Sequence, residues 1–135
     1  PGAVFDPSAE LDRETDLVRR KENAGAKFFI TQPVFELDQV EKFLSGYRER
    51  HSRDFGTAVF WAVQIVVPHG KVFGPTPPWV KNIIDNGGSG EKIAVETMRS
   101  LTAAGYRGLY LIPPVVRGTR PDYGAVKRVL AEFRG

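Results

Sequence analysis

The sequence predicts an α/β fold in which parallel strands alternate with helices. Three observations lead to this class. Helical periodicity fills the stretches between several short apolar runs. An Ala-Gly pair, typical of a helix end that turns into a strand, occurs at Ala24-Gly25 and again at Ala104-Gly105. The apolar runs themselves have the composition of strands and cover residues 3–5, 26–31, 58–67 and 108–112.

The two middle runs carry the strongest strand signal. Residues 27–31 and 59–67 are rich in β-branched and aromatic side chains and show little alternation with polar ones. Such runs indicate strands that are buried on both faces, as in a parallel sheet. The longer run contains a single polar residue, Gln64, and ends at Pro68.

Helices are expected between and after these strands. A short helix over residues 79–85 follows Pro77-Pro78, because proline is tolerated in a first turn. Asn86-Gly87-Gly88 then supplies its stop. The other helices are predicted from apolar residues at helical spacing over residues 11–24, 37–47, 94–105 and 126–133.

The predicted order of elements is β-α-β-α-β-α-α-β-α, which calls for a parallel sheet with right-handed crossovers. A four-stranded open sheet and half of a (β/α)8 barrel both fit this order, since a whole barrel needs about 250 residues. In either architecture residues 1–135 form one domain. A half-barrel would leave open sheet edges at residues 3–5 and 108–112, so we expect an oligomer or association with a missing half. The chain has no initiator Met, and we expect Pro1 to be an internal residue.

Composition and charge exclude several classes of protein. The chain has 19 Lys and Arg, 16 Asp and Glu, 2 His and no Cys, which leaves no disulfide, thiolate or metal constellation. Its basic residues are dispersed and lack interleaved aromatics, which argues against nucleic-acid binding. No apolar run reaches the roughly 18 residues of a membrane helix. The lack of Cys fits a reducing compartment, so a cytoplasmic protein is expected.

A ligand site is expected at the C-terminal ends of the strands. Gln32 is the best candidate there, because its amide combines a donor and an acceptor and can pair with a heterocycle such as a pterin. The same amide could equally cap the following turn. Asp6 and residues 113–120 follow two other strands. His69 could shuttle protons, although a single His without a nearby carboxylate favours a solvated loop position.

Three further features have structural explanations. His51 lies at the opposite end of its βα unit and is expected to be structural. The charged run over residues 48–53 suits the solvated C-terminus of a helix. Residues 87–92 resemble a phosphate loop only faintly, and a helix stop followed by the N-cap Ser89 explains them better.

Residues 21–33, which read Lys-Glu-Asn-Ala-Gly-Ala-Lys-Phe-Phe-Ile-Thr-Gln-Pro and are followed by Phe35 and Glu36, resemble the methylenetetrahydrofolate reductase family. In that family a Lys-x-x-x-Ala-Gly-Ala helix end leads into a strand that closes on Ile-Thr-Gln-Pro. Weaker similarity covers most of the chain, and Pro113-Pro114 is most similar to members fused to a homocysteine S-methyltransferase domain. The resemblance implies that the chain corresponds to strands five to eight of a (β/α)8 TIM barrel.

The resemblance also implies an activity in one-carbon metabolism and methionine biosynthesis. Such flavin oxidoreductases hold FAD in the barrel mouth and use NAD(P)H to reduce 5,10-methylenetetrahydrofolate to 5-methyltetrahydrofolate. By resemblance, Gln32 and Arg117 would contact the folate, and the FAD would be contacted by Asp6, Glu14, Arg20 and Lys21. No catalytic residue is expected in this segment, because the catalytic acid belongs to the missing N-terminal half. The isolated chain is therefore expected to be inactive.

One departure from the family pattern and two other interpretations remain. Residues 64–68, Gln-Ile-Val-Val-Pro, replace a Pro-Gly-Ile-x-Pro strand end. The chain could be a non-catalytic half-barrel that serves as a scaffold or assembly domain. It could also be an unrelated flavodoxin-like domain that binds a small molecule.

Overall fold

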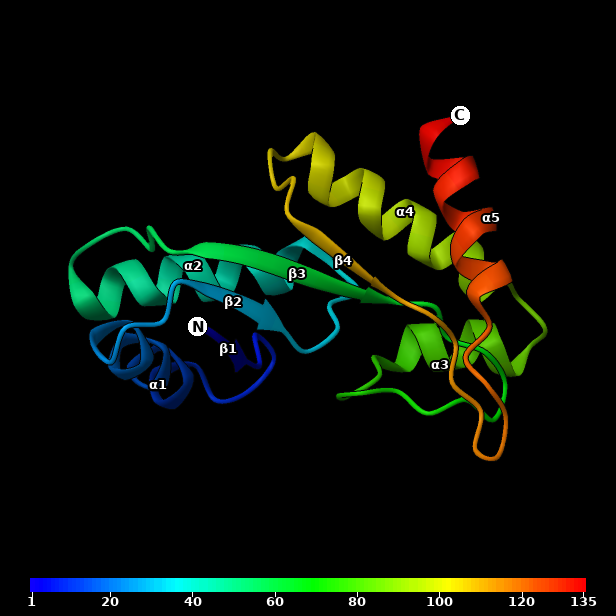
Figure 1. The fold of residues 1–135 in the computed structure, drawn as a ribbon, viewed down its shortest axis with the longest axis horizontal. Coiled ribbons are helices and arrows are strands. Elements are labelled where there is room, and N and C mark those ends of the chain that lie inside the picture. Colours follow the sequence, from blue (N-terminus) through cyan, green and yellow to red (C-terminus); the bar gives the residue numbers. More distant parts are fainter.

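The computed structural model describes residues 1–135 as a four-stranded parallel sheet with five helices (Figure 1). The order of elements is the predicted one. Along the chain they are β1 (Gly2–Phe5), α1 (Leu11–Asn23), β2 (Phe28–Thr31), α2 (Leu37–His51), β3 (Ala58–Gln64), α3 (Pro78–Asp85), α4 (Gly90–Ala103), β4 (Leu109–Ile112) and α5 (Tyr123–Arg134).

The strands lie in the sheet in the order of the sequence, β1-β2-β3-β4, and every neighbouring pair is parallel. A flavodoxin-like sheet reverses its strand order at a switch point, and this sheet has no such reversal. The arrangement is consistent with half of a (β/α)8 barrel, in which each strand pairs with the next one along the chain. The assignment to strands five to eight stays a prediction.

Local capping signals position the helix ends as predicted. Ala24 and Ala104 cap α1 and α4, and the glycines that follow adopt the left-handed backbone, with φ of +103° at Gly25 and +99° at Gly105. Ser89 is the N-cap of α4, and its side chain accepts a hydrogen bond from the backbone of Lys92. Residues 87–92 therefore form a helix stop and a helix start, not a phosphate loop. No helix has the length and apolar character needed to cross a membrane.

β3 ends at Gln64, so it is shorter than the predicted run over residues 58–67. The backbone N–H of Ile65 still donates to the Ile112 carbonyl across the sheet, but the next bond of this parallel ladder would need the N–H of residue 114, which is a proline and has none. Val66 instead packs in a small apolar cluster with residues of α3 and α4. β2 likewise begins at Phe28, since the backbone N–H of Ala26 is bonded to the end of α1.

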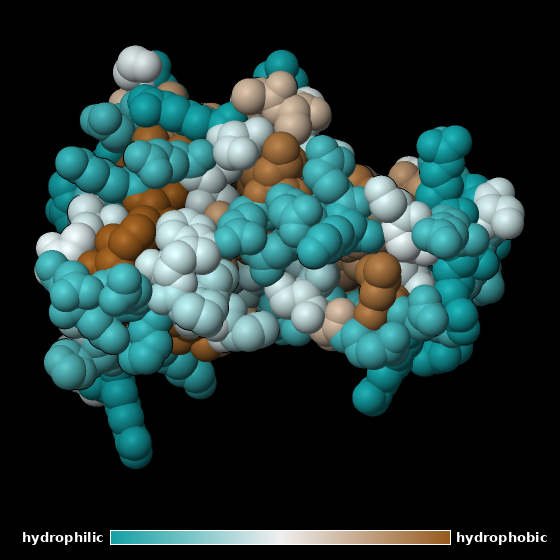
Figure 2. Space-filling view, turned by 180° about the vertical axis from the view of Figure 1, so that it is seen from behind, coloured by the Kyte–Doolittle hydropathy of each residue, from teal (hydrophilic) through white to brown (hydrophobic).

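The main core lies on one face of the sheet. Phe5, Phe29 and Trp61 are at most 3% exposed and belong to one apolar cluster with residues of four helices. Figure 1 shows α2 behind β2 and β3, and the view from behind in Figure 2 shows a mostly hydrophilic outer surface. The helices contribute to this cluster Val18 from α1, Val40, Phe43 and Tyr47 from α2, Ala94, Val95, Met98 and Leu101 from α4, and Ala125 and Val129 from α5.

The opposite face of the sheet is left partly uncovered, and we call it the open face. Val4, Phe28, Phe60 and Tyr110 project from it by the alternation of side chains along a strand, and they are 48%, 36%, 41% and 49% exposed. In a closed barrel this face would line the interior. An uncovered apolar face is therefore the expected signature of half a barrel.

Neither β1 nor β4 has a strand on its outer side, as we expected, but side chains partly cap the edge at β1. On the outer side of β1, Glu14 Oε1 accepts the backbone N–H of Asp6 at 2.7 Å, and Lys21 Nζ donates to the carbonyl oxygen of Val4 at 2.6 Å. Two side chains of α1 therefore cap part of an edge that no strand covers. That the chain forms an oligomer or binds a missing half stays a prediction.

Candidate functional site

Gln32 lies where β2 ends, beside the end of β1. The backbone N–H of Gln32 donates to the Phe5 carbonyl at 2.9 Å, which continues the register that pairs Phe5 with Thr31 and so sets Gln32 beside Asp6. The Gln32 side chain is half-buried and makes no hydrogen bond within the chain. The capping role that the sequence left open is therefore not observed, and the amide is available to a ligand.

The residues around Gln32 in the Ile-Thr-Gln-Pro motif are structural. Thr31 is buried, and its Oγ1 accepts the backbone N–H of Ala62 at 2.9 Å. Pro33 is buried, and the backbone of Val34 donates to the Ala62 carbonyl at 2.8 Å. These bonds tie the end of β2 to the middle of β3, so the position of Gln32 is determined by both neighbouring strands.

Glu36, the acidic residue after the motif, connects two helices. It forms a capping box with Gln39 at the start of α2, and it also accepts a hydrogen bond from the indole N–H of Trp79 in α3. Phe35 is buried, and its carbonyl accepts the hydroxyl of Thr97 from α4 at 3.3 Å. The motif therefore holds α3 and α4 against the C-terminal end of the sheet.

Of the residues expected at a flavin, most already have partners within the chain. Glu14 is 8% exposed, and both it and Lys21 bond to the outer edge of β1. Asp6 Oδ1 accepts the backbone N–H of Ser8 at 2.8 Å. Arg20 alone is exposed and free of an ion pair. Sequence reasoning missed the bonds of Glu14 and Lys21 to β1.

A buried glutamine that the sequence analysis did not assign to the site organises the end of β3. Gln64 is 2% exposed, its Nε2 donates to the Lys71 carbonyl at 2.8 Å, and its Oε1 accepts the backbone N–H of Phe73 at 3.0 Å. Both bonds hold residues 71–74, which we call the β3 loop. The signal for this role was present in the sequence, because a lone polar residue in an apolar strand must find partners when buried.

The β3 loop lies against Gln32 on one side. A Cβ built on Gly74 would be 3.7 Å from the Cβ of Gln32, which is ordinary van der Waals contact. Phe73 is 39% exposed, and the Lys71 ammonium lies 5.4 Å from the centroid of its ring. An unpaired amide therefore lies next to a loop that carries an exposed aromatic ring and a cation.

On its other side the β3 loop joins the loop after β4. Gly70 forms an isolated antiparallel bridge with Val116, and the backbone N–H of Lys71 donates to the Val115 carbonyl at 2.7 Å. Arg117 follows directly and is exposed without an ion pair. The loops after β2, β3 and β4 thus form one continuous surface from Gln32 to Arg117.

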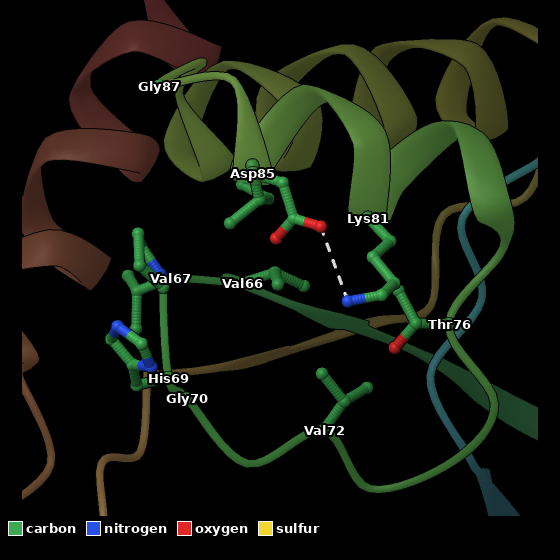
Figure 3. A pocket seen from close by; sticks show the side chains of 11 residues that line it. Val66, Val67, His69, Gly70, Val72, Thr76, Lys81, Asp85 and Gly87 are labelled. Carbon is green, nitrogen blue, oxygen red and sulfur yellow. Dashed lines mark ion pairs between the residues drawn. The ribbon is translucent and has the colours of Figure 1, made fainter.

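A cavity of about 750 Å³ lies between the end of β3 and α3 (Figure 3). Its lining includes Val66, Val72 and Ile84, and Lys81 and Asp85 form an ion pair beside it at 3.3 Å. His69 also lines it, with a φ of 62° that few side chains adopt. His69 is exposed and has no acidic partner, as the sequence favoured. Neither Gln32 nor Arg117 lines this cavity.

His51 is far from these loops and has the structural position that we expected. It ends α2, and its Nε2 lies 3.3 Å from Asp16 Oδ1 of α1. Arg50 holds the same carboxylate through two hydrogen bonds of 2.9 Å, and these bonds lower the pKa of Asp16. No group of three or more His, Asp and Glu side chains is arranged to hold a metal ion.

Comparison with known proteins finds a likeness to solved structures. No family model matches the chain, and no curated protein matches it. A solved structure of an uncharacterized protein from Clostridium thermocellum, described as binding two copies of 5-methyl-5,6,7,8-tetrahydrofolic acid, aligns with a TM-score of 0.67 at 17% identity. The alignment covers 98% of this chain and 52% of that protein, so the chain spans about half its length. At this identity the likeness establishes a shared fold.

Proposed function

We propose that this chain binds a reduced folate at the C-terminal end of its sheet, as half of a (β/α)8 barrel. The observation that carries the proposal is the Gln32 side chain, a half-buried amide at the end of β2 that has no hydrogen-bond partner in the chain. The shared fold with a protein described as binding 5-methyltetrahydrofolic acid supports the same ligand class.

The chemistry of the three loops suits the two ends of a folate. The pterin ring presents donors and acceptors along one edge, and the Gln32 amide can match one of each. The tail of a folate ends in carboxylates, which a guanidinium such as that of Arg117 binds through paired, charge-assisted hydrogen bonds. The exposed β3 loop lies between these residues.

Calorimetric titration of the natural full-length polypeptide with 5-methyltetrahydrofolate tests this proposal. Removing one amide pairing in a desolvated site costs about 1–3 kcal/mol, so Gln32→Ala should raise the Kd about tenfold or more. Gln32→Glu is the matched control, because it keeps the size and one acceptor but loses the donor. If Gln32→Ala binds as tightly as the wild type, the assignment of Gln32 to the ligand is wrong.

The more specific function, FAD-dependent reduction of 5,10-methylenetetrahydrofolate with NAD(P)H, rests on the family resemblance. Glu14 and Lys21 do not fit the cofactor as they stand, since both are bonded to β1, and Asp6 is bonded to its own turn. Arg20 is the exposed cation that remains for a phosphate.

The absorbance spectrum of the purified full-length protein tests the flavin directly. A bound flavin that is lost in Arg20→Gln, with the melting temperature of the apo-protein nearly unchanged, would support the oxidoreductase. In such a protein Gln32→Ala should slow the turnover of folate but spare an artificial electron acceptor. A protein that binds folate but never carries flavin would leave folate binding as its function.

A further inference from the structure

We propose that Gln64 is a positioning residue, which fixes the β3 loop against Gln32 and thereby sets the affinity of the ligand site. The inference rests on the proposed function for the identity of the ligand. It concerns the end of β3, where Gln64 is the one polar residue in an otherwise apolar run.

Both polar atoms of the Gln64 amide form hydrogen bonds to the β3 loop. The side chain is 2% exposed, with Nε2 bonded to the Lys71 carbonyl and Oε1 to the Phe73 N–H. Lys71 has a second support from the Val115 carbonyl, whereas no other backbone bond holds Phe73. The position of Phe73 therefore depends on Gln64.

The loop lies beside Gln32, so its position bears on that side chain. Gly74 follows Phe73, and a Cβ at Gly74 would lie 3.7 Å from Gln32 Cβ and 3.6 Å from Pro33 Cδ. A β3 loop that moves away would leave the half-buried Gln32 side chain without this neighbour and expose it further to water. Gln64 thus acts on the ligand without touching it.

The test compares Gln64→Leu with Gln64→Glu in the full-length protein. Leucine fills the volume but removes both hydrogen bonds, while glutamate keeps an acceptor for the Phe73 N–H. We expect the Phe73 amide of Gln64→Leu to exchange its hydrogen at least tenfold faster. The Kd for 5-methyltetrahydrofolate should rise about tenfold, and Gln64→Glu should restore most of the protection and affinity.

Thr97→Val is the matched control, because it removes a buried hydroxyl that bonds only to the carbonyls of Phe35 and Ile93. It should leave the Kd unchanged. Gly74→Ala disturbs the same loop without changing Gln64, because few side chains adopt the φ of +154° found at Gly74. This variant should weaken binding even if Gln64→Leu fails to fold.

The outcomes separate the two proposals. If the wild type binds folate and both Gln64→Leu and Gly74→Ala bind equally well, the positioning role is wrong and the proposed function stands. If the wild type does not bind folate, the proposed function fails and this inference fails with it. Faster exchange at Phe73 together with weaker binding and rescue by glutamate supports the positioning role.

Discussion

The two outer edges of the sheet are built differently. At β1 the outward N–H of Asp6 and the outward carbonyl of Val4 are bonded to Glu14 and Lys21 of α1. At β4, bonds from Trp61 to Gly108 and from Ile65 to Ile112 turn those carbonyls inward, so Leu109 and Leu111 direct their backbone groups outward. No strand or side chain meets them there. The β1 edge is partly capped by side chains, and the β4 edge is not capped.

The helices beside the two edges explain this difference. Glu14 and Lys21 are seven residues apart, which corresponds to about two turns and places them on one side of α1. The helices beside β4 present apolar residues to its edge instead, and a groove of about 300 Å³ is lined there by Met98, Leu130 and Phe133. Polar side chains at the right turns of a helix can replace a neighbouring strand, whereas apolar ones leave the edge unpaired.

Glu14→Ala should have the largest effect on stability, because it removes the charged acceptor of the Asp6 N–H on the outer side of β1. We expect a loss of about 1.5–3 kcal/mol in the free energy of unfolding, measured by urea denaturation. Glu14→Gln keeps an acceptor and should lose much less. Equal stability of Glu14→Ala and the wild type would mean that α1 does not support β1.

Hydrogen exchange should distinguish the two edges in the unmodified protein. The amide of Asp6 has an acceptor, whereas the amides of Leu109 and Leu111 face outward without one. We expect the latter two to exchange at least tenfold faster, which corresponds to about 1.4 kcal/mol in local opening. Comparable protection at both edges would show that β4 acquires a partner in solution, such as a second copy or a missing half-barrel.

Lys21→Met should have a smaller effect than the Glu14 variant. The Lys21 ammonium is partly exposed, so the lost bond to the Val4 carbonyl should cost about 0.5–1 kcal/mol in unfolding free energy. Lys21→Arg, which can still donate, is the control. A Lys21→Met protein that begins to associate in light scattering would show that this side chain also protects the edge.

The last effect concerns Tyr106, which precedes β4, and it appears only at high pH. Burial, together with the hydrogen bond from the Tyr106 hydroxyl to Glu41, raises the pKa of Tyr106 to about 12. The folded protein favours the neutral phenol of Tyr106. The contribution of Tyr106 to the free energy of unfolding is therefore complete below a pH of about 10 and is lost as the pH rises toward 12. Thermal unfolding should show this loss in the wild type and not in Tyr106→Phe.

Much of the fold was predictable because its signals are local. The Ala-Gly pairs, Ser89 and the apolar periodicity each act within a few residues, and all of them have the predicted structure. The end of β3 was not predictable in this way. It depends on Pro114, which is far along the chain and lacks the N–H that the ladder would need next.

The same distinction between local and tertiary signals applies to the candidate site. The sequence by itself determined that Gln32 follows one strand and that Arg117 follows another, because local pattern shows where strands and loops lie along the chain. Only the tertiary structure decided that Glu14 and Lys21 bond to β1, that Gln64 holds the β3 loop, and that the Gln32 amide stays free. The physical reason is that hydrogen bonds of buried polar groups are satisfied by whichever donor or acceptor the fold brings near, and sequence spacing does not specify that partner.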